Sequence, residues 1–130
     1  MISAAGILFI TSSDKGDVGL FLRRGDGGDF PGLWAFPGGC EEPEDEGSAL
    51  ETALRECREE IGTLPAGQPK LLMTNILRHV PNVDYPAEDV EFTTFTQRVS
   101  ATFTPKLNAE HTGFCWIPLS DVASPIPAAA

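Results

Sequence analysis

Basic residues are scarce in this chain. Its 130 residues include 9 Lys and Arg against 19 Asp and Glu, a formal net charge of −10. General affinity for nucleic acid backbones needs clustered lysine and arginine, so we expect no general binding of DNA or RNA. An acidic protein can still bind anions where a bound cation reverses the local field.

Long apolar runs and an export signal are also missing. No apolar run approaches the roughly 20 residues that span a bilayer, and the N-terminus has no basic region followed by an apolar run and a cleavage site. The three cysteines are odd in number and lack zinc-finger spacing. We therefore expect a reduced, cytoplasmic protein without a membrane segment. The length predicts one domain with a single core that needs no disulfides.

Acidic residues are concentrated in one stretch. Nine of the 19 lie between Glu41 and Glu60. Carboxylates this close repel one another, so something must offset their charge. Water and salt do so on a surface, which is the more common situation for an acidic helix alone, and a hard cation such as Mg²⁺ does so in a site.

The second half of this stretch reads as a helix. Ser48, with Glu51 three residues later, is a capping-box pattern that predicts a helix start at about Ser48. Gly62 is a suitable left-handed stop. At 100° per residue, one face of this helix is apolar. That face carries Leu50, Ala53, Leu54, Cys57 and Ile61.

Three glutamates form a second stripe beside the apolar one. Measured from Leu50, Glu59 lies at about 180°, Glu56 at about 240° and Glu60 at about 280°. Glu56 and Glu60 are four residues apart and repel each other, which disfavours an isolated helix. Arg55 flanks Glu59 and could orient it through a charge-assisted hydrogen bond.

A glycine turn precedes the helix, at Pro37-Gly38-Gly39. The order of glycine pair, acidic loop and Arg-Glu-Cys-Arg-Glu-Glu-Ile-Gly over residues 55–62 resembles the Nudix box, the signature of the Nudix hydrolases. That box reads G-x5-E-x7-R-E-U-x-E-E-x-G-U, where U is a bulky apolar residue. The matching positions are Gly39, Arg55, Glu56, Glu59, Glu60 and Gly62.

The match has two departures from the box. Fifteen residues separate Gly39 from Arg55, where the family has 13. This insertion lies in the loop before the helix, where added length is well tolerated. Because of the insertion, the single glutamate between the glycine and the arginine of the box has no unique counterpart in this chain. Glu44 or Glu46 could take its position. Thr63 stands where an aliphatic residue is usual.

The resemblance runs along nearly the whole chain. Segments 20–24 and 33–39 read like the strand and turn that lead into the box, and segment 105–119 is similar to the L-x-x-E-H…W segment of Nudix enzymes acting on nucleoside triphosphates and dinucleoside polyphosphates. It implies an α/β Nudix fold over residues 1–130, a single Nudix hydrolase domain with a mixed β-sheet and a loop-helix-loop box. Pro125 and Pro127 predict that the family's second, C-terminal helix is short or missing.

The resemblance also implies a chemistry. Nudix enzymes hydrolyse a nucleoside diphosphate linked to another group X, so we expect divalent-metal-dependent hydrolysis of a phosphoanhydride bond in a small nucleotide. The implied metal ligands are Glu56, Glu59, Glu60 and the Gly38 carbonyl, with Mg²⁺ as the expected ion and Mn²⁺ as its alternative. Glu56 and Glu110 are alternative general bases.

The groups that would hold the substrate are less specific. Arg55 belongs to the implied catalytic residues because it could orient Glu59. Arg23 and Arg24 lie at a strand end near the box, where one of them could bind a substrate phosphate. Trp34 and Phe114 are expected in the core, which leaves the base-binding residues unidentified.

Two other functions stay open. A non-catalytic Nudix-like sensor would bind nucleotide without cleaving it, but such domains usually lose box glutamates that are present here. An ADP-sugar pyrophosphatase fits the box equally, although the Glu110-His111 segment resembles the polyphosphate group.

The shortened C-terminus raises the question of what covers the sheet. Segment 90–104 alternates, with large apolar groups on one face and mainly Thr, Ser, Gln and Arg on the other. It predicts a long strand with one face toward solvent. We expect either a homodimer that buries the residual apolar surface, or a monomer with an open side.

Overall fold

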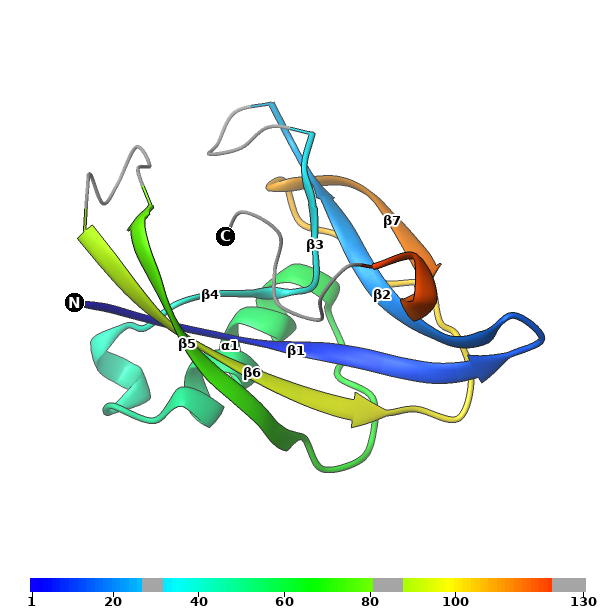
Figure 1. The fold of residues 1–130 in the computed structure, drawn as a ribbon, viewed down its shortest axis with the longest axis horizontal. Coiled ribbons are helices and arrows are strands. Elements are labelled where there is room, and N and C mark those ends of the chain that lie inside the picture. Colours follow the sequence, from blue (N-terminus) through cyan, green and yellow to red (C-terminus); the bar gives the residue numbers. More distant parts are fainter. Residues whose placement is uncertain (27–31, 81–87, 123–130) are drawn as a thin grey trace.

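A computed structural model describes residues 1–26, 32–80 and 88–122, without the side chains of residues 78–80 and 88. In these ranges seven strands form one mixed sheet, and one α-helix packs on it (Figure 1). The α/β architecture predicted from the sequence is confirmed. Residues 123–130, with both C-terminal prolines, lie outside the described residues, so the prediction about a second helix is tested only as far as Val122.

The strands are short at the glycine turn and long elsewhere. They are β1 (Ile2–Ser13), β2 (Gly16–Arg24), β3 (Trp34–Ala35), β4 (Gly38–Cys40), β5 (Lys70–Val80), β6 (Glu88–Arg98) and β7 (His111–Pro118). Their order is β3-β2-β1-β6-β5, with β4 paired to β1 and β7 to β2. The β1–β6 pair is parallel, and the other pairs are antiparallel.

The helix α1 (Ala49–Ile61) forms as the sequence predicts. The Ser48 hydroxyl accepts a hydrogen bond from the Glu51 N–H at 3.2 Å, which caps the first turn. Gly62 ends the helix at φ +87°, a conformation that glycine adopts without strain. With 13 residues and charged groups on its outer face, this sole α-helix of the described ranges cannot cross a membrane.

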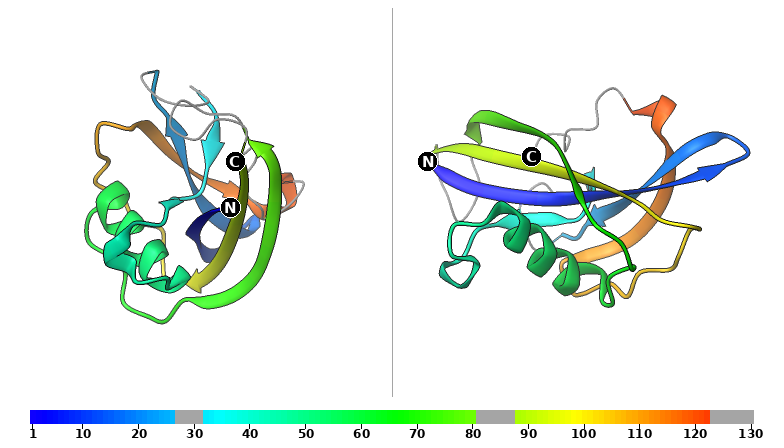
Figure 2. Two further views of the ribbon diagram at one scale, coloured as in Figure 1. Left: turned by 90° about the vertical axis from the view of Figure 1, so that its left-hand side faces the viewer. Right: turned by 90° about the horizontal axis from the view of Figure 1, so that it is seen from below.

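The predicted apolar stripe of α1 faces the sheet. Ala53, Cys57 and Ile61 are fully buried, and they pack with Ile7 and Leu22 in a core between the helix and the sheet. Figure 2 shows α1 lying along one side of the sheet, against β1 and β4. This packing fixes which side of α1 faces outward, and so where its glutamates lie.

A second core lies on the other face of the sheet, built around Phe21, Phe36 and Phe92. Phe36 meets Phe21 and Phe92 edge to face, with ring centroids 6.3 and 6.1 Å apart. Because Phe36 directly precedes the glycine turn, this packing anchors the start of the turn.

The prediction for segment 90–104 is wrong in two respects. The strand ends at Arg98, and neither of its faces is solvent-exposed as a whole, since Thr94 and Gln97 are buried. The reason is that β6 lies between β1 and β5 and carries core residues on both faces, with Phe92 in one core and Phe95 in the other. The Gln97 amide is satisfied by donating to backbone carbonyls of the connector after α1.

Candidate active site

Glycines bring the turn against the central strand. A Cβ on Gly38 would lie 2.6 Å from the Ala5 carbonyl oxygen, and one on Gly6 would lie 2.5 Å from the Pro37 carbonyl oxygen. Neither distance is tolerable for real atoms, so any side chain at these positions would separate β4 from β1. The close pairing holds the backbone of residues 37–39 beside the outer edge of α1.

The same turn contacts two of the helix carboxylates. The Gly38 N–H donates a 2.8 Å hydrogen bond to Glu60 Oε1. A Cβ on Gly39 would collide with the carboxylate of Glu56. The box glycines therefore have a structural reason, because they let the backbone approach the carboxylates of α1.

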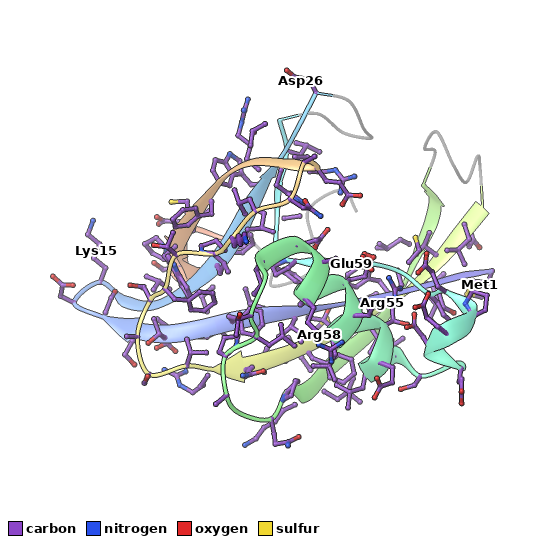
Figure 3. All side chains as sticks on the ribbon, turned by 180° about the vertical axis from the view of Figure 1, so that it is seen from behind. Met1, Lys15, Asp26, Arg55, Arg58 and Glu59 are labelled. Carbon is purple, nitrogen blue, oxygen red and sulfur yellow. The ribbon has the colours of Figure 1, made fainter. Side chains whose placement is uncertain are left out.

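The three glutamates of α1 differ in exposure. Glu60 is buried, the side chain of Glu56 is 14% exposed, and that of Glu59 is 51% exposed. Figure 3 shows Glu59 and Arg55 on the outer side of the helix. The stripe predicted from the helical angles is confirmed, but the burial of Glu60 was not predicted. It follows from the turn of β4, which covers that edge of the helix.

Burial changes the protonation of two of these acids. Desolvation, with the charges of Glu59 and Glu110, raises the pKa of Glu56 to about 7 against the opposing effect of Arg55. Burial also raises the pKa of Glu60 well above its ordinary value, although the Gly38 N–H opposes this shift. Ionised near neutral pH, both carboxylates would be stabilised by a nearby cation.

Arg55 is surrounded by hydrogen-bond acceptors. Its Nε and Nη2 donate to the two carboxylate oxygens of Asp45 at 2.9 Å each, and Nη2 also reaches the Cys40 carbonyl at 2.8 Å. Its Nη1 lies 3.2 Å from Glu59 and 3.2 Å from Glu42. The predicted contact with Glu59 is confirmed. Since all three guanidinium nitrogens are engaged, Arg55 orients Glu59 and ties the acidic loop to the helix.

Asp45 is a residue that the sequence reasoning missed. It is buried, and it also accepts hydrogen bonds from the Thr52 hydroxyl at 2.9 Å and the Glu42 N–H at 3.0 Å. The Arg55 guanidinium holds the pKa of Asp45 well below its ordinary value. Glu44 and Glu46 are both exposed.

Asp45, rather than Glu44 or Glu46, therefore occupies the place of the isolated box acid. It is the sixth residue after Gly39, the spacing that the box requires, and this count could have identified it. The two-residue insertion then falls between Asp45 and Arg55.

The start of β7 brings further groups to the same edge of α1. Ligand atoms of Glu60, Glu110 and His111 all lie within 4.8 Å of one another, and His111 Nε2 is 3.8 Å from Glu60 Oε2. Burial and the charge of Arg24 lower the pKa of His111 to about 4, so this imidazole is neutral near pH 7. Glu110, one of the two candidate general bases, thus lies beside Glu60 of the helix.

The two candidate phosphate-binding arginines lie on opposite faces of β2, since side chains alternate along a strand. Arg24 pairs with His111, and its charge acts on both His111 and Glu60. Arg23 is exposed on the other face, where it donates to the Thr112 hydroxyl at 3.2 Å. Of the two, Arg24 is the one beside the carboxylates.

Two aromatic predictions are wrong. Trp34 and Phe114 were expected in the core, but each is 37% exposed. Both lie on β3 and β7, which pair only with β2 among the described strands, and packing partners are fewer there than in the centre of the sheet.

The site as a whole gathers oxygen donors from elements far apart in sequence. Glu60 binds the backbone of Gly38, Glu56 lies against Gly39, and Glu110 lies beside Glu60. The charges of Glu59 and Glu110 act on Glu56, and a donor set of carboxylates such as this suits Mg²⁺ or Mn²⁺. The raised pKa values of the buried acids fit a cation as well, because its charge would offset the cost of ionising them.

Comparisons with known proteins agree with this site. A model of the NUDIX domain family matches residues 2–130. Nucleoside triphosphatase NudI of Escherichia coli is 35% identical over 107 residues, which cover 75% of this chain and 70% of that protein.

Solved structures give the same fold. The NUDIX domain of Shewanella oneidensis NrtR, complexed with ADP ribose, has a TM-score of 0.74 at 22% identity and covers 94% of this chain and 75% of its own. A MutT protein from Methanosarcina mazei has a TM-score of 0.71 at 26% identity, covering 92% of this chain and 78% of its own. The chain therefore belongs to the NUDIX family and is a MutT-like Nudix hydrolase.

Proposed function

We propose that this hydrolase cleaves a phosphoanhydride bond in a nucleoside triphosphate, or in another nucleoside diphosphate linked to a group X, by attack of water at phosphorus with a divalent cation bound. The observation that carries this proposal is the group of carboxylates at the glycine turn, where Glu60 accepts from the Gly38 N–H, Glu56 lies against Gly39, and Glu110 lies beside Glu60. The relationship to a nucleoside triphosphatase favours the triphosphates.

Four carboxylates and one backbone group would hold the cation: Glu56, Glu59, Glu60, Glu110 and the Gly38 carbonyl. When bound, Mg²⁺ or Mn²⁺ supplies positive charge to the phosphoryl oxygens and makes a nearby water more acidic. Arg55 keeps Glu59 in place through its Nη1, and Asp45 holds Arg55.

The remaining groups act on the proton and the phosphates. Glu56, with a pKa of about 7, is suited to take a proton from the attacking water near neutral pH. Glu110 is the second carboxylate that can do so, since it is exposed and lies within the same cluster. Arg24 lies beside the cluster, where its guanidinium would bind phosphate oxygens.

An ADP-sugar is the second candidate substrate, because the NrtR NUDIX domain of the same fold was solved with ADP ribose. A sensor that only binds nucleotide is the third reading. A cytoplasmic location, where nucleotides and Mg²⁺ are plentiful, is part of the proposal.

The test is a nucleotide panel with Mg²⁺, scored by released phosphate and pyrophosphate. The panel contains the common nucleoside triphosphates, a dinucleoside polyphosphate and ADP ribose. We expect the highest kcat/KM with a triphosphate. Binding without release of product from any of these compounds would contradict hydrolysis and favour the sensor.

A matched pair of helix variants assigns the activity to the site. Glu59→Gln should lower kcat by about 10²–10³-fold, since it removes one of the negative charges that would hold the cation at the reacting phosphate. Its melting temperature should stay close to that of the wild type, because the side chain is half exposed. Glu51→Gln, exposed in the first turn of the same helix, is the control and should retain full activity.

A further inference from the structure

Trp34 and Phe114, the exposed aromatic side chains in the described ranges, lie on opposite faces of the sheet. Leu22 of β2 pairs with Phe114 of β7 on one side and with Ala35 of β3 on the other. Residues paired across antiparallel strands project from the same face, and Leu22 belongs to the core beneath α1. Phe114 therefore lies on the α1 face, whereas Trp34, paired with Arg23, lies on the opposite one.

Phe114 stands one step along this face from the candidate active site. Arg24 is two residues from Leu22 along β2, about 7 Å on the same face, and it pairs with His111 across a register shift that leaves Thr112 without a partner in the ladder. Phe114 is 37% exposed, while Leu22 is fully buried. An open aromatic ring thus neighbours the arginine and the imidazole that adjoin the carboxylates.

The row that crosses the sheet at this ring is small or apolar beyond it. Leu22 lies next to Phe114 and Ala35 lies beyond Leu22, where it carries only a methyl group. Leu33, whose carbonyl accepts the Arg24 N–H at 2.9 Å, is itself 37% exposed. A flat group lying on Phe114 would thus meet no charged side chain in this row, while the adjoining end of the same molecule extended toward Arg24.

We propose that Phe114 is the platform on which the base of the nucleotide stacks, with the phosphates at Arg24 and the carboxylate cluster. This inference rests on the proposed function. Every nucleobase has an aromatic face, and stacking on a phenyl ring tolerates all of them. Since Phe114 offers no donor or acceptor, it selects a nucleotide over a bare polyphosphate without selecting one base.

The experiment compares Phe114→Ala, Phe114→Trp and the matched control Trp34→Ala. KM and kcat are measured with ATP and Mg²⁺, and inorganic triphosphate is used as a competitor that lacks the base. Phe114→Ala should raise KM for ATP about tenfold, the effect of one lost stacking contact, and leave kcat within about threefold. Phe114→Trp should restore the wild-type KM, and Trp34→Ala should not change it.

The competitor separates stacking from a merely structural role. The inhibition constant of inorganic triphosphate should be the same for the wild type and Phe114→Ala, because both keep Arg24 and the carboxylates. An equal weakening of ATP and triphosphate would overturn the proposal, as would an unchanged KM in Phe114→Ala or a raised one in Trp34→Ala.

A direct binding measurement keeps this test apart from that of the proposed function. If the wild type hydrolyses no nucleotide, the dissociation constant of ATP is measured by calorimetry in its place. Weaker ATP binding by Phe114→Ala, with unchanged triphosphate binding, would support stacking although hydrolysis had failed. No ATP binding by the wild type would overturn both.

Discussion

Asp45 shows how one buried acid can organise a whole site. It accepts hydrogen bonds from Nε and Nη2 of the Arg55 guanidinium, and Arg55 in turn contacts Glu59 and the Cys40 carbonyl. Neither acid next to Asp45 in sequence is buried. The acidic loop is therefore attached to α1 chiefly through one side chain.

Asp45→Asn should lower both the melting temperature and kcat. The amide keeps the shape but loses the charge that faces Arg55, and one of its two atoms becomes a donor pointed at a donor. Glu44→Gln, an exposed neighbour, is the control and should change neither quantity. Thermal unfolding gives the melting temperatures of the two variants, and steady-state kinetics give their kcat values. The same melting temperature and kcat in Asp45→Asn and Glu44→Gln would show that the Asp45–Arg55 pair is dispensable.

Glu56 and Glu60 predict an unusual pH dependence for the metal-free protein. Their folded-state pKa values lie above the ordinary value, so each stabilises the fold at low pH and loses that contribution as pH rises through the folded pKa, about 7 for Glu56. His111, with a folded pKa of about 4 against an ordinary 6.5, acts in the opposite direction and more weakly at these pH values, because its contribution to stability is lost only as pH falls from about 6.5 toward 4.

The protein in excess chelator should therefore melt a few degrees higher at pH 6.5 than at pH 8. Mg²⁺ should stabilise it more at pH 8, because fewer protons then compete for the same oxygens. Differential scanning calorimetry at the two pH values, with and without Mg²⁺, measures both effects. A melting temperature that rises from pH 6.5 to pH 8 in chelator would contradict the raised pKa values.

At the scale of elements, the site depends on how closely β4 approaches α1. Gly39→Ala should displace the Glu56 carboxylate, because its Cβ would occupy the same space. A misplacement of about 1 Å can lower a rate by about 10²-fold, and we expect a loss of that order in kcat. Gly113→Ala is the control, since its Cβ would meet no atom within 4 Å. Comparable kinetics for the two variants would contradict this role of Gly39.

A helix or strand could be predicted from the sequence where the residues that define it lie within it. The contacts between elements distant in sequence could not be predicted. The limits of α1 and its apolar face follow from Ser48, Gly62 and the 3.6-residue period, all of which lie within the helix. The burial of Glu60 depends on a turn 22 residues away, and the different faces of Arg23 and Arg24 depend on which side of β2 meets α1. The exposure of Phe114 likewise follows from its strand partners rather than from its neighbours in sequence.

At the scale of the whole molecule, three of the exposed apolar side chains lie together on the edge strand β5. Leu71 is 65% exposed, Leu72 43% and Ile76 39%, and β5 pairs only with β6 among the described strands. Exposed apolar edge strands favour association. The sequence predicted a residual apolar surface but did not locate it.

We expect a homodimer that covers this edge. Light scattering at micromolar concentration should give about twice the chain mass of 13.9 kDa, and Leu71→Lys with Ile76→Lys should return it to the monomer. A mass near that of one chain, unchanged on tenfold concentration, would rule the dimer out and leave an open-sided monomer.

The central claim is that the clustered carboxylates act on nucleotides through a divalent cation. The most direct test is nucleoside triphosphate hydrolysis by metal-stripped protein, first in excess chelator and then during titration with Mg²⁺ or Mn²⁺. The rate should be negligible in chelator, rise to saturation with either ion, and stay low in Glu59→Gln at every concentration. Hydrolysis that continues undiminished in excess chelator would contradict the claim.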